Sequence, residues 1–521
     1  MNKANLTAYE VVTEENLTDI HSTGWLLRHK KTGARVMLIE NDDENKVFNI
    51  AFRTPPKDST GVAHILEHSV LCGSREFPLK DPFVELVKGS LNTFLNAMTY
   101  PDKTCYPVAS CNDKDFQNLM HVYLDAVFYP NIYKREEIFR QEGWNYHLEQ
   151  KEGPLKYNGV VYNEMKGAFS SPDEVLEREI MNHLFPDTTY GCESGGDPKN
   201  IPDLTYENFL NFHRTYYHPS NSYIYLYGNM DMEKKLAFID EHYLSHFDYL
   251  DVDSVIQEQK AFGACRDVTL EYPVAENEGE EDNTYLSYNM VVGNAADSQM
   301  AMAFEVLDYA LLSAPGAPLK QALLDVKAGK DVYGSYDDGI LQPYFTVIAK
   351  GSNPDRKEEF VSVIRQVLGD IVKNGIDKKA VEAGINYFEF RYREADFSSY
   401  PKGLMYSLDI LGDWLYEKGN PFAQVQQLTV FEKLKKAVNE GYFEELIRKY
   451  LLENPHGCIM TLVPKKGLAA QREKELEEKL EAYRSSLSEE QLDAMVEKTK
   501  ALEAYQEAGE DPKALECIPM L

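Results

Sequence analysis

The residues best suited to chemistry in this sequence are His64, Glu67 and His68, in the order His-x-x-Glu-His. On an α-helix, residues four apart share a face, and the residue three along lies beside them. His64 and His68 can therefore offer two imidazole nitrogens to one ion, with Glu67 next to it. Two neutral imidazoles and a carboxylate suit Zn²⁺ and leave one position open for water. The metal would acidify that water, and Glu67 would accept its proton during attack on a carbonyl.

The elements around this motif must form a helix over Ala63–Val70, which Ser59 or Thr60 is expected to cap. An apolar stripe would bury the opposite face of the helix: Val62, Leu66 and Val70. The motif alone leaves open that both histidines are ordinary surface or core residues. It also names no third ligand, because several downstream carboxylates are available by spacing: Glu142, Glu149, Glu164 and Glu174.

Composition limits the possible partners and compartments. The 521 residues carry 54 Lys and Arg against 85 Asp and Glu, a net charge of −31. Such a surface repels nucleic acid and anionic membranes, so neither is expected as a partner. An apolar run of about 18 residues, which a transmembrane helix requires, is absent. The seven cysteines are odd in number and lack Cys-x-x-Cys spacing, and the N-terminus resembles no signal or transit peptide, so a cytoplasmic protein is expected.

The pattern of elements predicts an α+β fold with two tandem domains, each with an antiparallel sheet packed by helices. Arg35–Glu40 and Val47–Phe52 read as a β-hairpin, and Tyr223–Tyr227 as a further strand. The first domain is expected at residues 1–255. An acidic, poorly periodic stretch at 251–282 marks the boundary, and a second domain should occupy 283–465. Residues 466–521 predict a polar helical hairpin with a capping box at Ser488 and Gln491.

Two blocks of sequence resemble the pitrilysin and insulinase family of inverted-zincin metallopeptidases, and in particular its presequence-protease and falcilysin branch. The first, at 61–110, reads GVAHILEHSVLCGSREFPLKDPFVELVKGSLNTFLNAMTYPDKTCYPVAS. The second, at 158–172, reads NGVVYNEMKGAFSSP. The resemblance implies a zinc endopeptidase that acts on short, unstructured peptides, with Glu67 as general base and then general acid.

The same resemblance assigns further residues. It places the third zinc ligand at Glu164, with His64 and His68 as the other two. It also implies a substrate-binding edge strand at Asn92–Thr99, where Asn96 and Ala97 would pair with the peptide backbone by strand addition. The second domain would repeat the fold without a zinc motif and line a chamber.

Members of that branch are about twice as long, with two homologous halves joined by a helical hairpin. This chain resembles the first half, so a C-terminal half of the same enzyme is an expected partner. The alternative function is therefore a catalytically incomplete half-enzyme, which binds zinc and peptide but needs the other half for turnover. A peptide-binding scaffold is disfavoured because the zinc motif is intact. A structural zinc site is disfavoured because such sites fill all four positions with protein ligands.

Overall fold

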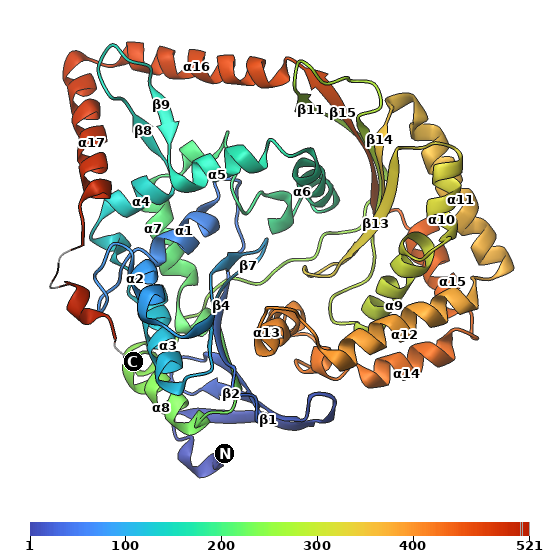
Figure 1. The fold of residues 1–521 in the computed structure, drawn as a ribbon, viewed down its shortest axis with the longest axis horizontal. Coiled ribbons are helices and arrows are strands. Elements are labelled where there is room, and N and C mark those ends of the chain that lie inside the picture. Colours follow the sequence, from blue (N-terminus) through green and yellow to red (C-terminus); the bar gives the residue numbers. More distant parts are fainter. Residues whose placement is uncertain (511, 513, 520–521) are drawn as a thin grey trace.

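Two large β-sheets, each covered by helices, dominate the computed structural model, which describes residues 1–510, 512 and 514–519 (Figure 1). Most strand pairs are antiparallel, and one pair in each sheet is parallel. The α+β class predicted from the sequence is confirmed. Within the described ranges, no helix is long and apolar enough to cross a membrane.

The first sheet has eight strands in the order β1-β2-β3-β10-β4-β7-β5, with β6 also paired to β7. The strands are β1 (Tyr9–Leu17), β2 (Ser22–His29), β3 (Arg35–Glu40), β4 (Lys46–Arg53), β5 (Asn92–Leu95), β6 (Met98–Thr99), β7 (Lys103–Ser110) and β10 (Ser222–Gly228). Helices packed on one face are α1 (Val62–Val70), α3 (Asp113–Phe128), α4 (Glu136–Glu142), α5 (Val160–Ala168), α7 (Tyr206–Tyr216) and α8 (Met232–His242). The short helix α2 (Pro82–Gly89) precedes the edge strand β5.

The strands β3 and β4 form where predicted, but they are not the two arms of a hairpin. Strand β10 lies between them, parallel to β3 and antiparallel to β4. The hairpin prediction was therefore wrong in its pairing. The loop at 41–45 is long enough to pass over an inserted strand, and β10 is buried along its whole length. Its alternating Tyr, Ile and Leu side chains fill both faces of the sheet centre.

The second sheet has five strands in the order β11-β15-β12-β14-β13. They are β11 (Arg266–Val274), β12 (Thr284–Val291), β13 (Asp331–Asp337), β14 (Tyr344–Ser352) and β15 (Gly457–Lys466). One face carries α9 (Ser298–Asp308), α10 (Pro318–Asp325), α11 (Lys357–Asn374), α12 (Lys378–Glu394), α14 (Leu428–Ala437) and α15 (Tyr442–Leu446). Strand β11 lies inside the stretch expected to be a linker, so this sheet begins before the predicted start at 283. Because β11 is a largely exposed edge strand, its alternation is diluted by charged residues.

The inner face of each sheet is covered by a helix from the other part of the chain. Helix α13 (Lys402–Trp414) packs Leu404, Ile410 and Trp414 on the first sheet. Helix α6 (Pro172–Leu184) packs Leu176 and Ile180 on the second. Both helices lie between the two sheets in Figure 1. The two sheets are therefore joined by an exchange of helices as well as by the connecting segment.

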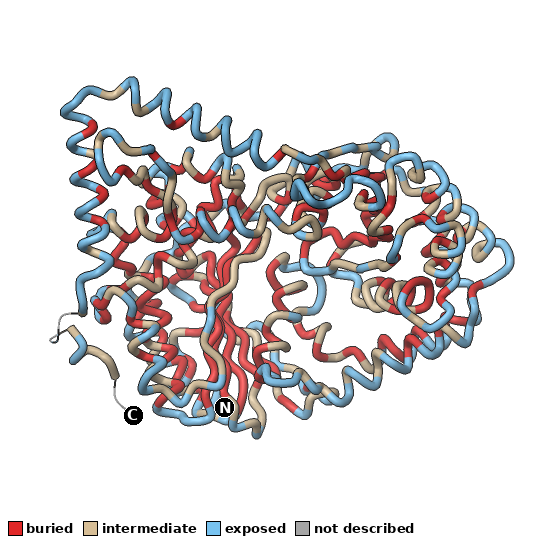
Figure 2. Tube along the Cα trace, turned by 45° about the horizontal axis from the view of Figure 1, so that its top comes forward, coloured by how far each residue is buried: buried red, intermediate tan, exposed pale blue. Residues whose placement is uncertain are grey.

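The last two helices, α16 (Leu468–Ser486) and α17 (Glu489–Glu507), form the predicted hairpin with its Ser488–Gln491 capping box. Figure 2 shows α16 as mostly exposed, spanning from the second sheet toward the first. The hairpin packs on a two-stranded sheet of β8 (Asn145–His147) and β9 (Lys156–Asn158), where Leu480, Leu492 and Val496 meet Leu148 and Leu155. The hairpin thus braces the helices that carry the candidate site.

Candidate metal centre

Helix α1 presents the three chemically competent residues on one side because its other side is anchored in the core. Val62, Ile65, Leu66 and Val70 are at most 6% exposed and pack in the core under the first sheet. The predicted apolar stripe is thus buried. The predicted cap is wrong: Gly61 occupies the N-cap position in a left-handed conformation, with φ of 70°. The Ser59 hydroxyl instead accepts a hydrogen bond from the Glu193 amide.

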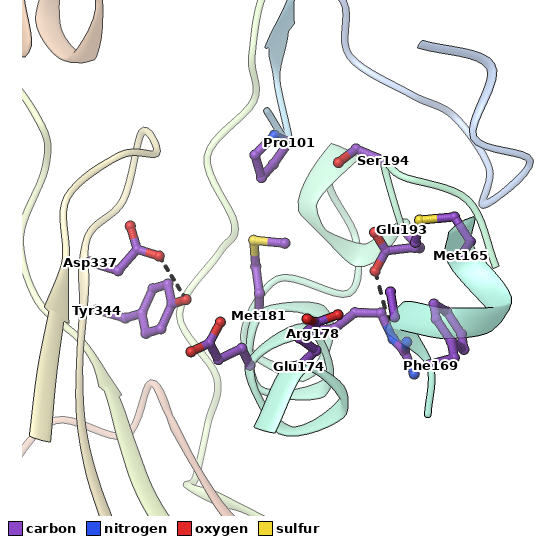
Figure 3. A pocket seen from close by; sticks show the side chains of 12 residues that line it. Pro101, Met165, Phe169, Glu174, Arg178, Met181, Glu193, Ser194, Asp337 and Tyr344 are labelled. Carbon is purple, nitrogen blue, oxygen red and sulfur yellow. Dashed lines mark hydrogen bonds and ion pairs between the residues drawn. The ribbon is translucent and has the colours of Figure 1, made fainter. Parts of the chain in front are cut away.

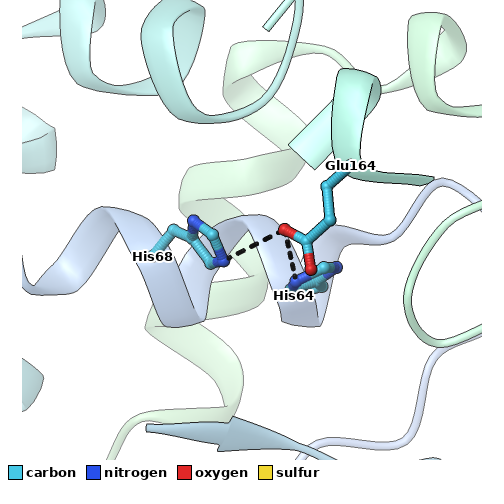
Figure 4. A group of neighbouring side chains, drawn as sticks. All are labelled: His64, His68 and Glu164. Atoms are coloured by element: carbon cyan, nitrogen blue, oxygen red, sulfur yellow. Dashed lines mark ion pairs between the residues drawn. The ribbon is translucent and has the colours of Figure 1, made fainter. Parts of the chain in front are cut away.

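The two histidines converge on the carboxylate of Glu164, which α5 supplies (Figure 4). The Nε2 atoms of His64 and His68 each lie 3.7 Å from Glu164 Oε2. One ligand atom from each of the three residues lies within 4.8 Å of the others. The side chains of His64, His68 and Glu164 are 12%, 25% and 53% exposed, so one side of the group faces solvent.

The other nitrogen of each imidazole is held by a neighbouring acceptor. His64 Nδ1 lies 3.0 Å from the Gly195 carbonyl oxygen, and His68 Nδ1 lies 3.2 Å from Glu142 Oε2. These contacts orient both Nε2 atoms toward the shared centre, as outer partners of metal-binding histidines do. Glu142, one of the carboxylates that spacing left open as a ligand, therefore supports His68 from behind. Its low exposure of 10% and its contact with His68 could not be read from sequence.

The electrostatics of the centre favour positive charge. Burial alone would lower the pKa of His68, but its hydrogen bond to Glu142 and the charges of Glu67, Glu142 and Glu164 raise it overall. Burial alone would raise the pKa of Glu142, but hydrogen bonds with His68 and Gln141 lower it overall. Three carboxylates thus surround two imidazoles. A donor set of two imidazole nitrogens and one carboxylate oxygen fits Zn²⁺ with an open fourth position.

Glu67 lies on the same helix and has its own support. Its Oε2 accepts a hydrogen bond of 2.6 Å from the Thr99 hydroxyl on β6. That contact ties the carboxylate to the segment following the edge strand. The sequence did not single out Thr99, although it lies within the segment predicted to bind substrate.

The predicted substrate strand Asn92–Thr99 forms as two pieces, β5 and β6, at one edge of the first sheet. Asn96 and Ala97 occupy the break between them. The Asn96 amide donates to the Pro107 carbonyl at 3.4 Å, and its own carbonyl accepts from the Tyr123 hydroxyl at 3.2 Å. Both groups of Asn96 are therefore already used within the protein. Peptide binding by Asn96 and Ala97 stays a prediction.

Replacing Gly61 with alanine is expected to destabilise the protein and weaken metal binding. A Cβ at this position would lie 2.7 Å from the Gly195 carbonyl oxygen, and φ of 70° is unfavourable for alanine. We expect a loss of about 1–2 kcal/mol in the free energy of unfolding from the backbone conformation alone. Displacing Gly195 would also loosen the orientation of His64. Thermal unfolding and zinc titration measure both effects. The control is Gly369→Ala in α11, where a Cβ meets nothing within 4 Å. Equal stability of the two variants would contradict this account.

Three family models match the chain. They are Insulinase (Peptidase family M16) at residues 52–191, the Peptidase M16 inactive domain at 203–388, and an associated domain of a subgroup of the same peptidases at 462–521. The first match contains all four residues of the centre. The matches together extend over most of the chain.

Similar proteins carry related names. "Protein HypA" of Clostridium perfringens is 52% identical over 99% of this chain and 53% of its own length. "Presequence protease 1, chloroplastic/mitochondrial" of Arabidopsis thaliana is 42% identical over 100% of this chain and 49% of its own length. "Presequence protease, mitochondrial" of Xenopus laevis is 35% identical over 96% of this chain and 49% of its own length. This chain thus spans about half the length of the curated relatives it matches, and its expected cytoplasmic location stays a prediction.

Solved structures share the fold at low identity. A protease from Helicobacter pylori aligns with a TM-score of 0.65 and 16% identity, over 88% of this chain and 99% of that one. Pitrilysin aligns with a TM-score of 0.62 and 15% identity, over 88% of this chain and 47% of that one.

Proposed function

The chain belongs to the M16 family of peptidases, and on that premise we propose that it is a zinc-dependent endopeptidase acting on short, unstructured peptides. The observation that carries the proposal is the convergence of His64, His68 and Glu164 with Glu67 beside them. Zn²⁺ is the expected ion because it suits two imidazoles and one carboxylate. The names of the presequence proteases support peptide hydrolysis.

When bound at His64, His68 and Glu164, zinc would polarise the scissile carbonyl and lower the pKa of a water molecule. Glu67 would accept a proton from the attacking water and deliver it to the leaving amine. The Thr99 hydroxyl holds the Glu67 carboxylate through a hydrogen bond, which limits its rotation during both transfers. Glu142 and the Gly195 carbonyl hold the two imidazoles in the matching orientation.

The preference for extended peptides rests on the sheet edge beside the centre. Strands β5 and β6 lie at the edge of the first sheet, and β6 carries the Thr99 that contacts Glu67. A peptide added at such an edge is recognised mainly through its backbone, so many sequences are accepted. A folded protein would not offer an extended segment there.

A second candidate is a half-enzyme that binds zinc and peptide but needs further protein for turnover. It is favoured by the length comparison, because the chain spans about half of its curated relatives. The C-terminal half expected from the sequence would then be the partner that completes the chamber.

Cleavage of an unstructured peptide of roughly 25 residues, followed by mass spectrometry, separates the two candidates. We expect the zinc-loaded protein to cut the peptide, a chelator to stop the cuts, and added zinc to restore them. Metal content measured on the same samples shows whether zinc is bound. Zinc binding without cleavage would favour the half-enzyme. A failure to bind zinc would contradict both candidates.

A further inference from the structure

A pocket of about 280 Å³ lies between the two sheets, next to the metal centre. We call it the flanking pocket; its wall on the first part of the chain includes Pro101, Glu177, Glu193 and Ser194. Asp337 and Tyr344 of the second sheet close it from the opposite side (Figure 3).

The flanking pocket adjoins the centre along three segments of chain. Met165 follows the ligand candidate Glu164, and Ser194 precedes Gly195, whose carbonyl orients His64. Pro101 lies two residues after Thr99, which holds Glu67. An extended peptide advances about 3.3 Å per residue. A peptide cut at the centre would therefore place a side chain close to the scissile bond in this pocket.

The single arginine in the pocket lining is already neutralised. Arg178 Nη2 lies 3.0 Å from Glu179 Oε1, and Arg178 Nε lies 3.6 Å from Glu193 Oε2. The guanidinium carbon also lies 3.5 Å from the centre of the Phe169 ring. Figure 3 shows Arg178 and Glu193 joined on one side of the pocket. Arg178 is therefore held away from the remaining carboxylates.

Those remaining carboxylates have no cation. In the part of the chain that the structure describes, the side chains of Glu174 and Glu177 make no hydrogen bond or ion pair. Asp337 accepts from the Tyr344 hydroxyl at 2.9 Å and the Gly339 amide at 3.0 Å, both neutral donors. The pKa of Glu177 is raised, first by partial desolvation and then by the charges of Asp337, Asp173 and Glu174. The pocket therefore holds negative charge that a bound cation would offset.

An independent feature also points to a polar ligand. Ser194 is only 8% exposed, and its hydroxyl has no hydrogen-bond partner among residues 1–510, 512 and 514–519. In Figure 3 this hydroxyl points toward Pro101, into the pocket. Buried hydroxyls are normally hydrogen-bonded, so one aimed at a cavity suits a donor from a ligand.

The pocket also contains apolar surface. Met165, Met181 and the Tyr344 ring contribute to the lining. Lysine and arginine bury an aliphatic stem along such surface while their charged end reaches polar groups. A bare metal ion would not use these side chains.

We infer that the flanking pocket binds a lysine or arginine side chain of the peptide, near the scissile bond, with Glu177 and Asp337 as its counter-charges and Ser194 as an acceptor. The inference rests on the proposed peptidase function and adds a specificity to it. Glu177 is the residue to test, since its exposed side chain makes no contact that folding requires.

The test compares peptides that differ at one position, with lysine, norleucine or glutamate placed in turn along an unstructured sequence. Cleavage is mapped by mass spectrometry, and binding is measured by fluorescence anisotropy on the zinc-loaded protein carrying Glu67→Gln. We expect one position near the cut to favour lysine over norleucine by about threefold to tenfold, as a partly exposed ion pair allows. Raising the salt concentration should reduce this preference.

Glu177→Gln should remove most of the lysine preference, and Glu177→Lys should shift it toward glutamate. The matched control is Glu241→Gln, an exposed residue on α8 away from the pocket, which removes the same charge. A lysine preference that is absent, or that survives both Glu177 variants, would overturn the inference. If no peptide is cut at all, the proposed function fails, while the binding comparison still decides the occupancy of the pocket.

Discussion

Replacing Glu67 with glutamine is expected to lower the rate of peptide cleavage by roughly 10²–10⁴-fold, the usual contribution of a general acid–base residue. Glutamine keeps the shape of the side chain and an oxygen that can accept the Thr99 hydrogen bond. It cannot accept and return a proton. Zinc content and thermal stability should therefore match the unsubstituted protein, while cleavage measured by mass spectrometry falls.

The control for Glu67→Gln is Glu85→Gln on α2, which removes a charge from a helix near the edge strand without touching the centre. It should leave cleavage within about twofold of the unsubstituted rate, as expected for a surface change. Cleavage by Glu67→Gln at the unsubstituted rate would exclude Glu67 as the proton acceptor. Loss of zinc together with activity would instead make Glu67 a part of the metal site.

Replacing Glu164 with glutamine is expected to produce the largest change in zinc affinity. A neutral amide is a poor substitute for the carboxylate oxygen that both histidines face at 3.7 Å. The affinity should fall by more than roughly 100-fold, beyond the 10–100-fold loss typical of outer partners. Glu142→Gln belongs to that second class, because Glu142 contacts His68 through Nδ1.

Glu149→Gln provides the third member of the series. The Glu149 carboxylate pairs with His147 Nε2 at 3.5 Å, so its replacement should leave zinc affinity unchanged. Competition with a chromophoric chelator measures all three variants on one scale. An order other than Glu164, then Glu142, then Glu149 would contradict the geometry of the centre.

Much of the local structure could be predicted from the sequence, because period and capping are properties of short segments. The helix bearing His64 and His68, the strand around Tyr223–Tyr227 and the capping box at Ser488 all form where expected. The placement of Asn96 and Ala97 at a sheet edge also follows. Their binding role is a separate matter that only peptide contacts can decide.

Features that depend on distant segments were not predictable in this way. The insertion of β10 between β3 and β4 is decided by packing across residues 35–228, and no local pattern encodes it. The left-handed cap at Gly61 depends on its close approach to Gly195 and Gly196. Spacing could not distinguish Glu142 from Glu164, since only the folded chain places one behind His68 and the other before it. The flanking pocket likewise exists only where α6 meets the second sheet.

The exchange of α6 and α13 has a consequence for how the protein comes apart. Separating the sheets would strip Leu176 and Ile180 from one and Leu404, Ile410 and Trp414 from the other, exposing both apolar faces at once. Unfolding of one sheet should therefore bring down the other, in a single cooperative transition. Breathing motions that admit a peptide would be confined to smaller pieces, such as α2 and the edge strand, and the two sheets would move as one body.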